Sequence, residues 1–412
     1  MKTTRTCRVA VMASAVSALA LTASAQESAT SLADALMSGD AGLDFRYRYE
    51  YVDQDNFSEN ANASTLLMRL NYKTGTWANW SGFVEFDYIG EVLVNDFNNG
   101  VDSSDDRDQY PAVLDPKGPD LNQVYVDYAA APDLLLRLGR QRIVLDNQRF
   151  VGGVAWRQNE QTFDGASVSY NGWANTKFFY SYVSQVRRIL GERSSAGSQD
   201  VDAHLLNAKI GLNDDWSVTP YIYYIDNEDA PANSTSTYGA RLDGKLAVGD
   251  GSLGLQAEFA SQSDAGNAPV SYDAQYLHLG ASWAMKNGLS LGIDFESLGG
   301  DANQPGSAFR TPLATLHAFQ GWADLFLATP AAGIDDLFVN VKYSVAKWQL
   351  QAIYHDFSAE SGSGDFGTEI DLAGSRKLND RYSLLLKAAF FSSDAAPYPD
   401  TTKFWVMLSA NF

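Results

Sequence analysis

Strict alternation of apolar and polar side chains runs through most of the chain and is the feature that most limits its fold. In LDFRYRYEY, the run from Leu43 to Tyr51, apolar and aromatic residues alternate with aspartate, arginine and glutamate. Successive side chains of a strand point to opposite faces, so this run predicts a strand with one apolar and one polar face. STLLMRLNYK, from Ser64 to Lys73, repeats the period of two.

Eighteen segments carry this alternation, and short connections such as AAAPD and NGWAN alternate with longer ones. An even number of strands about ten residues long, joined in this way, is typical of an outer-membrane barrel. We therefore predict an all-β, transmembrane antiparallel β-barrel with short periplasmic turns, longer extracellular loops and a lumen wide enough for an aqueous channel. The segments are 43–52, 64–73, 79–90, 121–130, 133–142, 163–171, 175–187, 202–212, 216–226, 236–247, 252–262, 271–285, 288–298, 336–344, 347–358, 366–377, 381–393 and 402–412.

A secreted soluble β-protein would also alternate, but two features favour a barrel in lipid. Tyrosine and phenylalanine gather at segment ends, as they do at membrane interfaces. The last segment, KFWVMLSANF, ends at Phe412 with its apolar residues in phase, a C-terminal signal by which the barrel-assembly machinery recognises its substrates. We therefore expect that machinery, outer-membrane lipid and lipopolysaccharide as partners.

The N-terminus predicts export. Residues 1–25 combine a basic start, a short apolar run and the small residues Ala23, Ser24 and Ala25, which is the pattern of a signal peptide. The apolar run is much shorter than the roughly 20 residues needed to span a bilayer. Residues 26–42 follow as a periplasmic lead-in, and residues 43–412 form the predicted barrel, so the sequence predicts the outer membrane of a Gram-negative bacterium.

Composition excludes several functions. A formal net charge of -20 argues against nucleic acid as a partner. The one cysteine, Cys7, lies in the signal peptide, the four histidines lack zinc-ligand spacing, and the acidic segment 91–120 lacks the regular spacing of a calcium loop. We therefore predict no metal, no cofactor and no enzyme, with calcium bridging by the carboxylates of segment 91–120 as an alternative to a solvated outer loop. A barrel-embedded hydrolase, with a triad assembled in space, remains the alternative.

Positive charge is concentrated in LRLGRQRIVLDNQRFVGGVAWRQNEQTFDG, residues 136–165. The leucines of its strand face lipid, so Arg137 points into the lumen. Unbroken alternation would place Arg140 on lipid, where an arginine near the bilayer centre costs about 2–4 kcal/mol. A one-residue bulge at Gly139 would reverse the alternation and let Arg140 and Arg142 line the channel with Arg137.

The residues after this strand predict a loop that folds into the lumen and narrows the pore. Guanidinium groups on such a loop bind carboxylates with two parallel hydrogen bonds, so the loop and the inner wall would form an anion-selective track. Two alternatives remain: these arginines pair with wall acids such as Asp127 and Asp146, or they bind lipopolysaccharide phosphates at the rim. The predicted track comprises Arg46, Arg48, Arg69, Arg137, Arg140, Arg142, Asp146, Arg149, Arg157 and Gln158.

Two stretches resemble the alginate-export family of outer-membrane porins: RLGRQRIVLDNQRFVGGVAWRQNEQTFDG and LHAFQGWADLFLATPAAGIDDLFVNVKY. The resemblance implies an eighteen-stranded barrel that carries an anionic polyuronate through an arginine-lined, loop-gated pore. The matching positions are Gly139, Arg140, Gln141, Arg142, Asp146, Arg149, Trp156, Arg157, Gln158 and Asp164 in the first stretch, and His317, Phe319, Gly321, Trp322, Ala323 and Asp324 in the second.

The segment 317–326 reads locally as a short amphipathic helix in the longest outer loop. It predicts either a lid over the pore mouth, with His317, Trp322 and Asp324 at its face, or a folded cap without a gating role. The function expected is passive diffusion of anionic or polar saccharide-like solutes, an alginate-type polyuronate or a related one. A general or cation-preferring porin for small hydrophilic solutes is the alternative.

Overall fold

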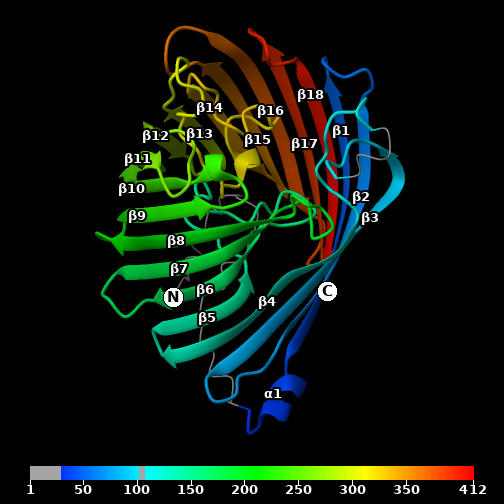
Figure 1. The fold of residues 1–412 in the computed structure, drawn as a ribbon, viewed down its shortest axis with the longest axis vertical. Helices are drawn as coiled ribbons and strands as arrows, with labels where there is room; N and C mark the ends of the chain where they lie inside the picture. The colour runs from blue at the N-terminus through cyan, green and yellow to red at the C-terminus, as the bar shows by residue number, and fades with distance from the viewer. Residues whose placement is uncertain (1–28, 102–106) are drawn as a thin grey trace.

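One antiparallel sheet closes on itself to form the molecule, as the computed structural model of residues 29–101 and 107–412 shows (Figure 1). The predicted signal peptide, residues 1–25, lies outside the described residues. Closure occurs because β1 pairs with β2 on one side and with β18 on the other. The strands are β1 (Asp40–Gln54), β2 (Ala61–Lys73), β3 (Trp80–Asp96), β4 (Gly118–Ala131), β5 (Leu134–Gln141), β6 (Thr162–Tyr170), β7 (Thr176–Arg187), β8 (Ser198–Gly211), β9 (Trp216–Asn227), β10 (Thr235–Val248), β11 (Gly251–Asp264), β12 (Asp273–Ala284), β13 (Leu289–Leu298), β14 (Ile334–Val345), β15 (Trp348–Ser358), β16 (Asp365–Lys377), β17 (Tyr382–Ser393) and β18 (Thr401–Asn411).

Every segment predicted from the alternation is a strand, and the eighteen-stranded barrel is confirmed. The connections also alternate as expected: Pro132 and Asp133 alone separate β4 from β5, whereas residues 299–333 separate β13 from β14. In a closed sheet each strand has a neighbour on both sides, so the backbone groups of the strands pair with one another.

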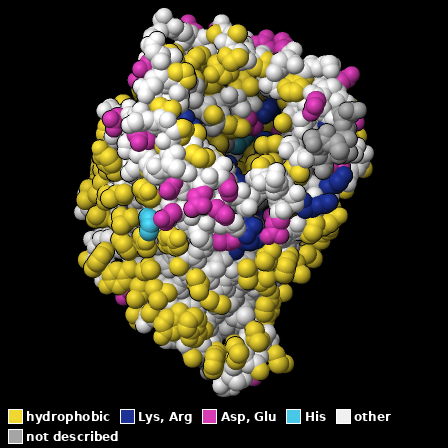
Figure 2. Space-filling view, viewed as in Figure 1, with side chains coloured by type: hydrophobic (Ala, Val, Ile, Leu, Met, Phe, Trp, Pro, Cys, Tyr) yellow, Lys and Arg dark blue, Asp and Glu magenta, His cyan; other side chains and the backbone are white. Residues whose placement is uncertain are grey.

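The two faces of the wall differ as the alternation requires. Leu138, Tyr238 and Ile293 are 62%, 59% and 52% exposed on the outer face, and Figure 2 shows hydrophobic side chains spread over the visible outer surface. Arg241 and Glu258, by contrast, lie buried on the inner face. The outer face is therefore suited to lipid, and the inner face is polar.

Two loops, loop 142–161 and loop 299–333, fold into the lumen. They meet in a parallel β-bridge between Val151 and Leu313, where the Gly152 N–H donates to the Leu313 carbonyl at 2.8 Å. The largest apolar cluster of the described residues combines both loops with the inner wall, so the core of this barrel sits inside the lumen. The inward fold of the arginine-bearing loop, predicted from sequence, is confirmed.

A short helix, α1 (Leu32–Met37), precedes the barrel and lies below β2 and β3 in Figure 1. The Ser31 side chain caps its N-terminus, and the Tyr72 hydroxyl donates to the Leu36 carbonyl at 2.6 Å. The predicted lead-in thus contains a helix, and β1 already begins inside it at Asp40. No described helix is long and apolar enough to cross a membrane.

Candidate pore site: a charged junction between two loops

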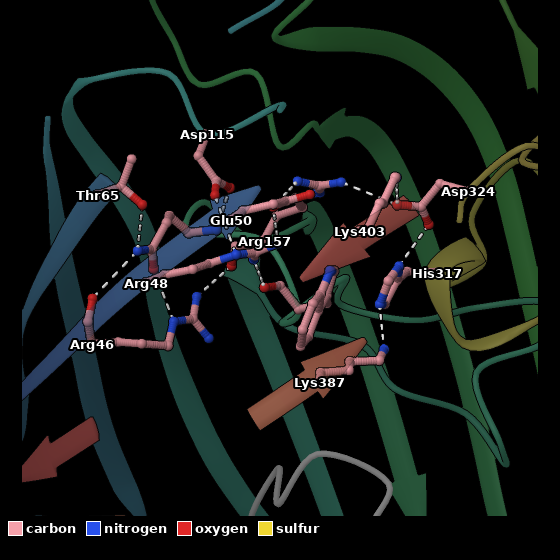
Figure 3. A network of polar contacts seen from close by, with 12 residues as sticks. Arg46, Arg48, Glu50, Thr65, Asp115, Arg157, His317, Asp324, Lys387 and Lys403 are labelled. Atoms are coloured by element: carbon pink, nitrogen blue, oxygen red, sulfur yellow. Dashed lines mark hydrogen bonds and ion pairs between the residues drawn. The ribbon is translucent and has the colours of Figure 1, made fainter. Parts of the chain in front are cut away.

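Loop 142–161 and loop 299–333 meet the wall at β1, β17 and β18, and charged side chains from all of them come together there (Figure 3). Three carboxylates and five cationic side chains make up this cluster, with His317 beside them. We call it the charged junction. Its members are Arg46, Arg48, Glu50, Asp115, Arg157, His317, Asp324, Lys387 and Lys403.

Glu50 is the fully buried centre of the junction. Its Oε2 accepts from Arg48 at 2.6 Å and from Arg157 at 3.2 Å, so one carboxylate joins β1 to the tip of loop 142–161. The Arg48 guanidinium also lies 4.4 Å from the ring centre of Trp156 and donates to the Trp156 carbonyl. Alternation places Arg48 and Glu50 on the inner face of the wall. The tip of loop 142–161 therefore contacts charged side chains whose positions are fixed by β1.

Asp324 is the carboxylate that loop 299–333 brings to the junction. Its oxygens accept from His317 at 2.6 Å, from Lys403 at 2.9 Å and from Arg157 at 3.3 Å. Burial by itself would raise the pKa of Asp324, but His317, Lys403 and Arg157 outweigh it and hold that pKa well below its usual range. Asp324 is therefore ionised, and it ties the two loops to each other and to β18.

His317 is held neutral in one tautomer. Burial lowers the pKa of His317 to about 3, although the neighbouring Asp324 carboxylate favours the charged ring. Its Nδ1 donates to Asp324, so Nε2 is the acceptor for the Lys387 ammonium at 2.6 Å. The ring also stacks on Trp156 at 4.3 Å with an interplanar angle of 5°. His317 thus adds shape and hydrogen bonds to the junction but no charge.

Lys387 ends inside a cage of three tryptophans. Its ammonium lies 3.5 Å from the ring centre of Trp322, 4.3 Å from that of Trp156 and 5.4 Å from that of Trp405. Aromatic faces attract a cation through their quadrupole, which compensates part of the lost hydration. No carboxylate among the described residues lies within 4.0 Å of this ammonium, so its charge is not cancelled by a direct ion pair.

Arg46 is a second cation without a direct counter-ion. It donates to the Gln158 side chain at 2.9 Å, to the Ala155 carbonyl at 2.7 Å and to the Arg157 carbonyl. Over the described part of the chain, no carboxylate comes within 4.0 Å of it. Arg46 and Lys387 are thus the two cations of the charged junction without a direct ion pair, while Glu369 and Asp371 on β16 accept from the Trp322 N–H beside Lys387.

Arg69 and Arg142 form a separate network on the β2–β3 side of the lumen. Arg69 binds Asp87 with two hydrogen bonds of 2.8 and 2.6 Å, and both arginines bind Glu160 at 2.9 and 2.6 Å. Burial alone would raise the pKa of Glu160, but the two guanidiniums lower it to about 2. With Glu85 3.4 Å from Arg142, acids match or exceed bases here.

The remaining lumen residues of the predicted track are paired with acids or amides. Arg137 binds Asp127 through bonds of 2.7 and 2.9 Å, and Arg149 lies 2.8 Å from Glu296. The alternative of pairing with wall acids therefore holds for Asp127. It does not hold for Asp146, which accepts from Asn207 at 2.7 Å and whose pKa is raised by burial.

The predicted bulge at Gly139 is wrong. Gly139 pairs one-to-one with Tyr125 and with Gly165, so the alternation continues and Arg140 shares the outer face with Leu138. Its charge is met there by Asp164 at 2.7 Å and by Glu192 at 2.8 Å. Arg140 thus lies outside the lumen, while Arg142 turns inward because β5 ends at Gln141 and the chain leaves the wall.

Glycine at position 139 has a different role. Its φ of +129° is unfavourable for other residues, and a Cβ there would lie 2.3 Å from the Val124 carbonyl oxygen. Close approach of β4 and β5, and not a change of register, requires this glycine.

The predicted helix at 317–326 is also wrong. Only a 3-10 turn, η2 (Leu316–Ala318), forms, and the backbone then turns through positive φ at Gln320, Gly321 and Asp324. The N–H of Ala323 donates at 2.8 Å to Glu369 on β16, as does that of Trp322. A distant carboxylate takes the place of helical hydrogen bonds, which the local sequence could not reveal. The segment lies inside the barrel against β16, β17 and β18, and its role as a lid or as a cap stays a prediction.

Sequence reasoning missed Lys403 and Trp405 as site residues. Both sit on the inner face of the last strand and alternate with the exposed Phe404 and Val406. The signal was present, since a lysine and a tryptophan occupy the polar phase of KFWVMLSANF. No group of three or more His, Cys, Asp or Glu side chains in residues 29–101 and 107–412 is placed to hold a metal ion.

Comparisons with known proteins agree with this architecture. The family profile described as alginate export matches residues 38–291. OccK8 (OprE) of Pseudomonas aeruginosa is similar in structure, with a TM-score of 0.71, 14% identity, and coverage of 92% of this chain and 98% of that chain. For OccAB2 of Acinetobacter baumannii the TM-score is 0.71, the identity 14%, and the coverage 90% and 98%.

OpdK of Pseudomonas aeruginosa, solved with vanillate, has a TM-score of 0.68 at 16% identity, with coverage of 90% and 98%. At such identities these structures support the fold. No curated protein sequence matches significantly. The matched family region covers more than half of the chain, which therefore belongs to the alginate export family and is a porin of the Gram-negative outer membrane, not an enzyme.

Proposed function

We propose that this porin passes anionic or polar saccharide-like solutes, an alginate-type polyuronate or a related compound, by passive diffusion past the charged junction. The observation that carries the proposal is that two cations, Arg46 and Lys387, lie without a direct ion pair where the two loops meet the wall. A fixed positive charge inside a low-dielectric wall attracts anions and repels cations, whatever the net charge of the whole protein.

The track that supports this proposal is shorter than the one expected from sequence. Arg46 and Lys387 contribute charge without direct counter-ions, and Arg48 and Arg157 share Glu50. Arg69, Arg137, Arg142 and Arg149 are matched by their own acids, and Arg140 faces outward. Selectivity is therefore assigned to the charged junction.

A general or cation-preferring porin is the competing function, favoured by the acids on β13–β16. Those acids have other partners: Glu296 binds Arg149, Asp336 binds His355 at 2.9 Å, and Glu369 accepts the backbone N–H groups of loop 299–333. Carboxylates engaged in this way contribute less field to a passing ion than unpaired ones. Contacts with lipid and lipopolysaccharide, and recognition of Phe412 by the assembly machinery, remain proposals.

The test is the reversal potential of the refolded protein in a planar bilayer under a salt gradient, with and without an oligouronate. We expect anion preference and oligouronate block in the wild type, both weakened several-fold in Arg46→Gln. Lys245→Gln is the matched control, because it removes an inner-wall charge near the periplasmic turn after β10. Cation preference in the wild type, unchanged by Arg46→Gln, would contradict the proposal and favour the competing function.

A further inference from the structure

Asp324 differs from Glu50 in where it is attached. Glu50 sits on the wall strand β1, whereas Asp115 lies between β3 and β4 and accepts from the Gln158 N–H at 2.9 Å. Asp324 instead hangs from loop 299–333, on a residue with a φ of +62°. Its contacts with Arg157 and Lys403 join that loop to the other loop and to β18. The carboxylate can leave its partners if the loop moves, without breaking the wall.

The surroundings of Asp324 are those of a carboxylate-binding site that is already filled. Arg157 and Lys403 direct N–H groups at one oxygen, and the His317 Nδ1–H is directed at the other. All three donors are nine-tenths or more buried. When a site excludes water, charged donors that point at one position bind an anion more strongly than water molecules would. A carboxylate from elsewhere would meet the same donors.

Flat aromatic faces lie directly beside these donors. Trp156 stacks on His317, and Trp322 covers the Lys387 ammonium at 3.5 Å. A planar carboxylate attached to a ring would place its charge between Arg157 and Lys403 and its ring against tryptophan. An uncharged sugar would gain the ring contact but could not replace the carboxylate.

We propose that Asp324 is a built-in competitor that closes the pore, and that the carboxylate of a ring-bearing solute, such as a uronate, displaces it from Arg157 and Lys403. This inference rests on the proposed function and adds its gate: loop 299–333 is released when the solute takes the place of Asp324. A binding site occupied by its own chain admits ligand in proportion to the fraction that is vacant.

The proposed gate predicts which solutes pass through the pore faster when the Asp324 carboxylate is removed. Asp324→Asn keeps the size of the side chain but loses the charge that holds Arg157 and Lys403, so the loop is released without solute. We expect uptake of radiolabelled glucose into proteoliposomes to rise about tenfold, as for an open fraction raised from roughly a tenth to nearly one. At a saturating concentration of radiolabelled glucuronate, which displaces Asp324 in the wild type as well, uptake should change little, so the wild-type preference for glucuronate over glucose is lost.

Asp243→Asn is the matched control. Asp243 is an inner-wall aspartate on β10 that binds Arg241 at 3.0 Å and, within the described residues, has no hydrogen bond to the charged junction, so its replacement should leave both uptake rates unchanged. Unchanged glucose uptake in Asp324→Asn, with a wild type that prefers glucuronate, would overturn the gate alone. A wild type without preference for glucuronate would overturn the proposed function and the gate together.

A second measurement uses a protein that keeps Asp324. Ala323→Cys places a thiol at a position that is 2% exposed next to Asp324, in a chain whose only cysteine is Cys7 in the signal peptide. Glucuronate should speed the reaction of this thiol with a charged methanethiosulfonate several-fold, and glucose should not. Equal rates with both sugars would refute solute-driven release of the loop, even if Asp324→Asn fails to fold.

Discussion

Loop 142–161 is held in the lumen at two places, which we call its Phe150 end and its Trp156 end, and the contacts at the two places differ in kind. On the β8–β13 side, Phe150 packs against Tyr221 at 5.1 Å and Tyr276 at 5.3 Å, in the largest apolar cluster of the described residues. On the β17–β1 side, Trp156 and Arg157 rest on arginine, lysine and carboxylate groups. Apolar packing is insensitive to ions, whereas ion pairs can exchange partners with a charged solute. One end therefore serves as an anchor, and the other is suited to respond to what passes.

The largest effect is expected when Glu50, the central carboxylate at the Trp156 end of the loop, loses its charge. Glu50→Gln leaves Arg48 and Arg157 buried without their shared carboxylate, and breaking a buried ion pair in this way costs about 3–5 kcal/mol. We expect the free energy of unfolding in urea to fall by that amount and the open-channel current to become noisy as the loop tip detaches. Equal stability and a quiet current would show that Glu50 does not hold the tip.

The anchor is tested by Phe150→Ala. Truncating a buried phenylalanine leaves a cavity and costs about 3 kcal/mol or more when neighbours do not collapse into it. We expect lower stability together with higher conductance, and no change in the ratio of anion to cation permeability because the charges remain. Phe259→Ala, on the outer face where the ring is 48% exposed, is the control. A changed permeability ratio in Phe150→Ala would mean that the two ends are coupled.

The effect of acid pH on stability tests the role of His317 at the Trp156 end of the loop. In the folded protein its pKa is lowered to about 3, against 6.5 for an exposed histidine. As pH falls below about 6.5, the unfolded chain takes up a proton at this site and the folded chain does not, so stability is lost until pH reaches about 3. His317→Gln should remove this loss, which amounts to at most about 1.4 kcal/mol per pH unit.

The measurement is the urea midpoint between pH 4 and 7 for the wild type and for His317→Gln. His204→Gln, at an exposed histidine on β8, controls for the loss of a histidine elsewhere. Parallel pH profiles for the wild type and His317→Gln would show that His317 titrates as an exposed ring does.

Most of the fold can be predicted from the sequence because the alternation of apolar and polar side chains is a local property. Residues 43–51 already show which side chains face inward, and the positions of Arg46, Arg48 and Glu50 follow from it. The junction itself could not be predicted, because it depends on which loop residues reach a given strand. Asp324 and Lys403 are 79 residues apart, and nothing in the local sequence of either identifies the other.

The two errors have a common cause. The bulge at Gly139 was inferred from the cost of an unpaired arginine in lipid, and the helix at 317–326 from local amphipathicity. In each case acids supplied by other elements satisfied the groups: Asp164 and Glu192 pair with Arg140, and Glu369 accepts the N–H groups after Gln320. Local rules failed where long-range ion pairs and hydrogen bonds replaced the interactions that those rules assume.

The smallest effect on transport is expected from Arg140→Ala, although Arg140 belongs to the arginine-rich stretch. Arg140 lies on the outer face and bonds to the Leu121 carbonyl at 2.7 Å where β5 ends, so it ties β4 to β6 in place of missing strand pairing. Its loss should cost about 1–3 kcal/mol, the penalty for a buried polar group left unpaired.

Reversal potentials should be the same for Arg140→Ala and the wild type, in contrast to Arg46→Gln. The two variants each remove one arginine from a chain of formal net charge -20, so any difference between them reports the position of the charge and not its number. If Arg140→Ala shifted the reversal potential as much as Arg46→Gln did, the outer face would contribute to selection. The division between an anchor built mainly of apolar contacts and a responsive, charged end would then no longer explain how this porin chooses its solutes.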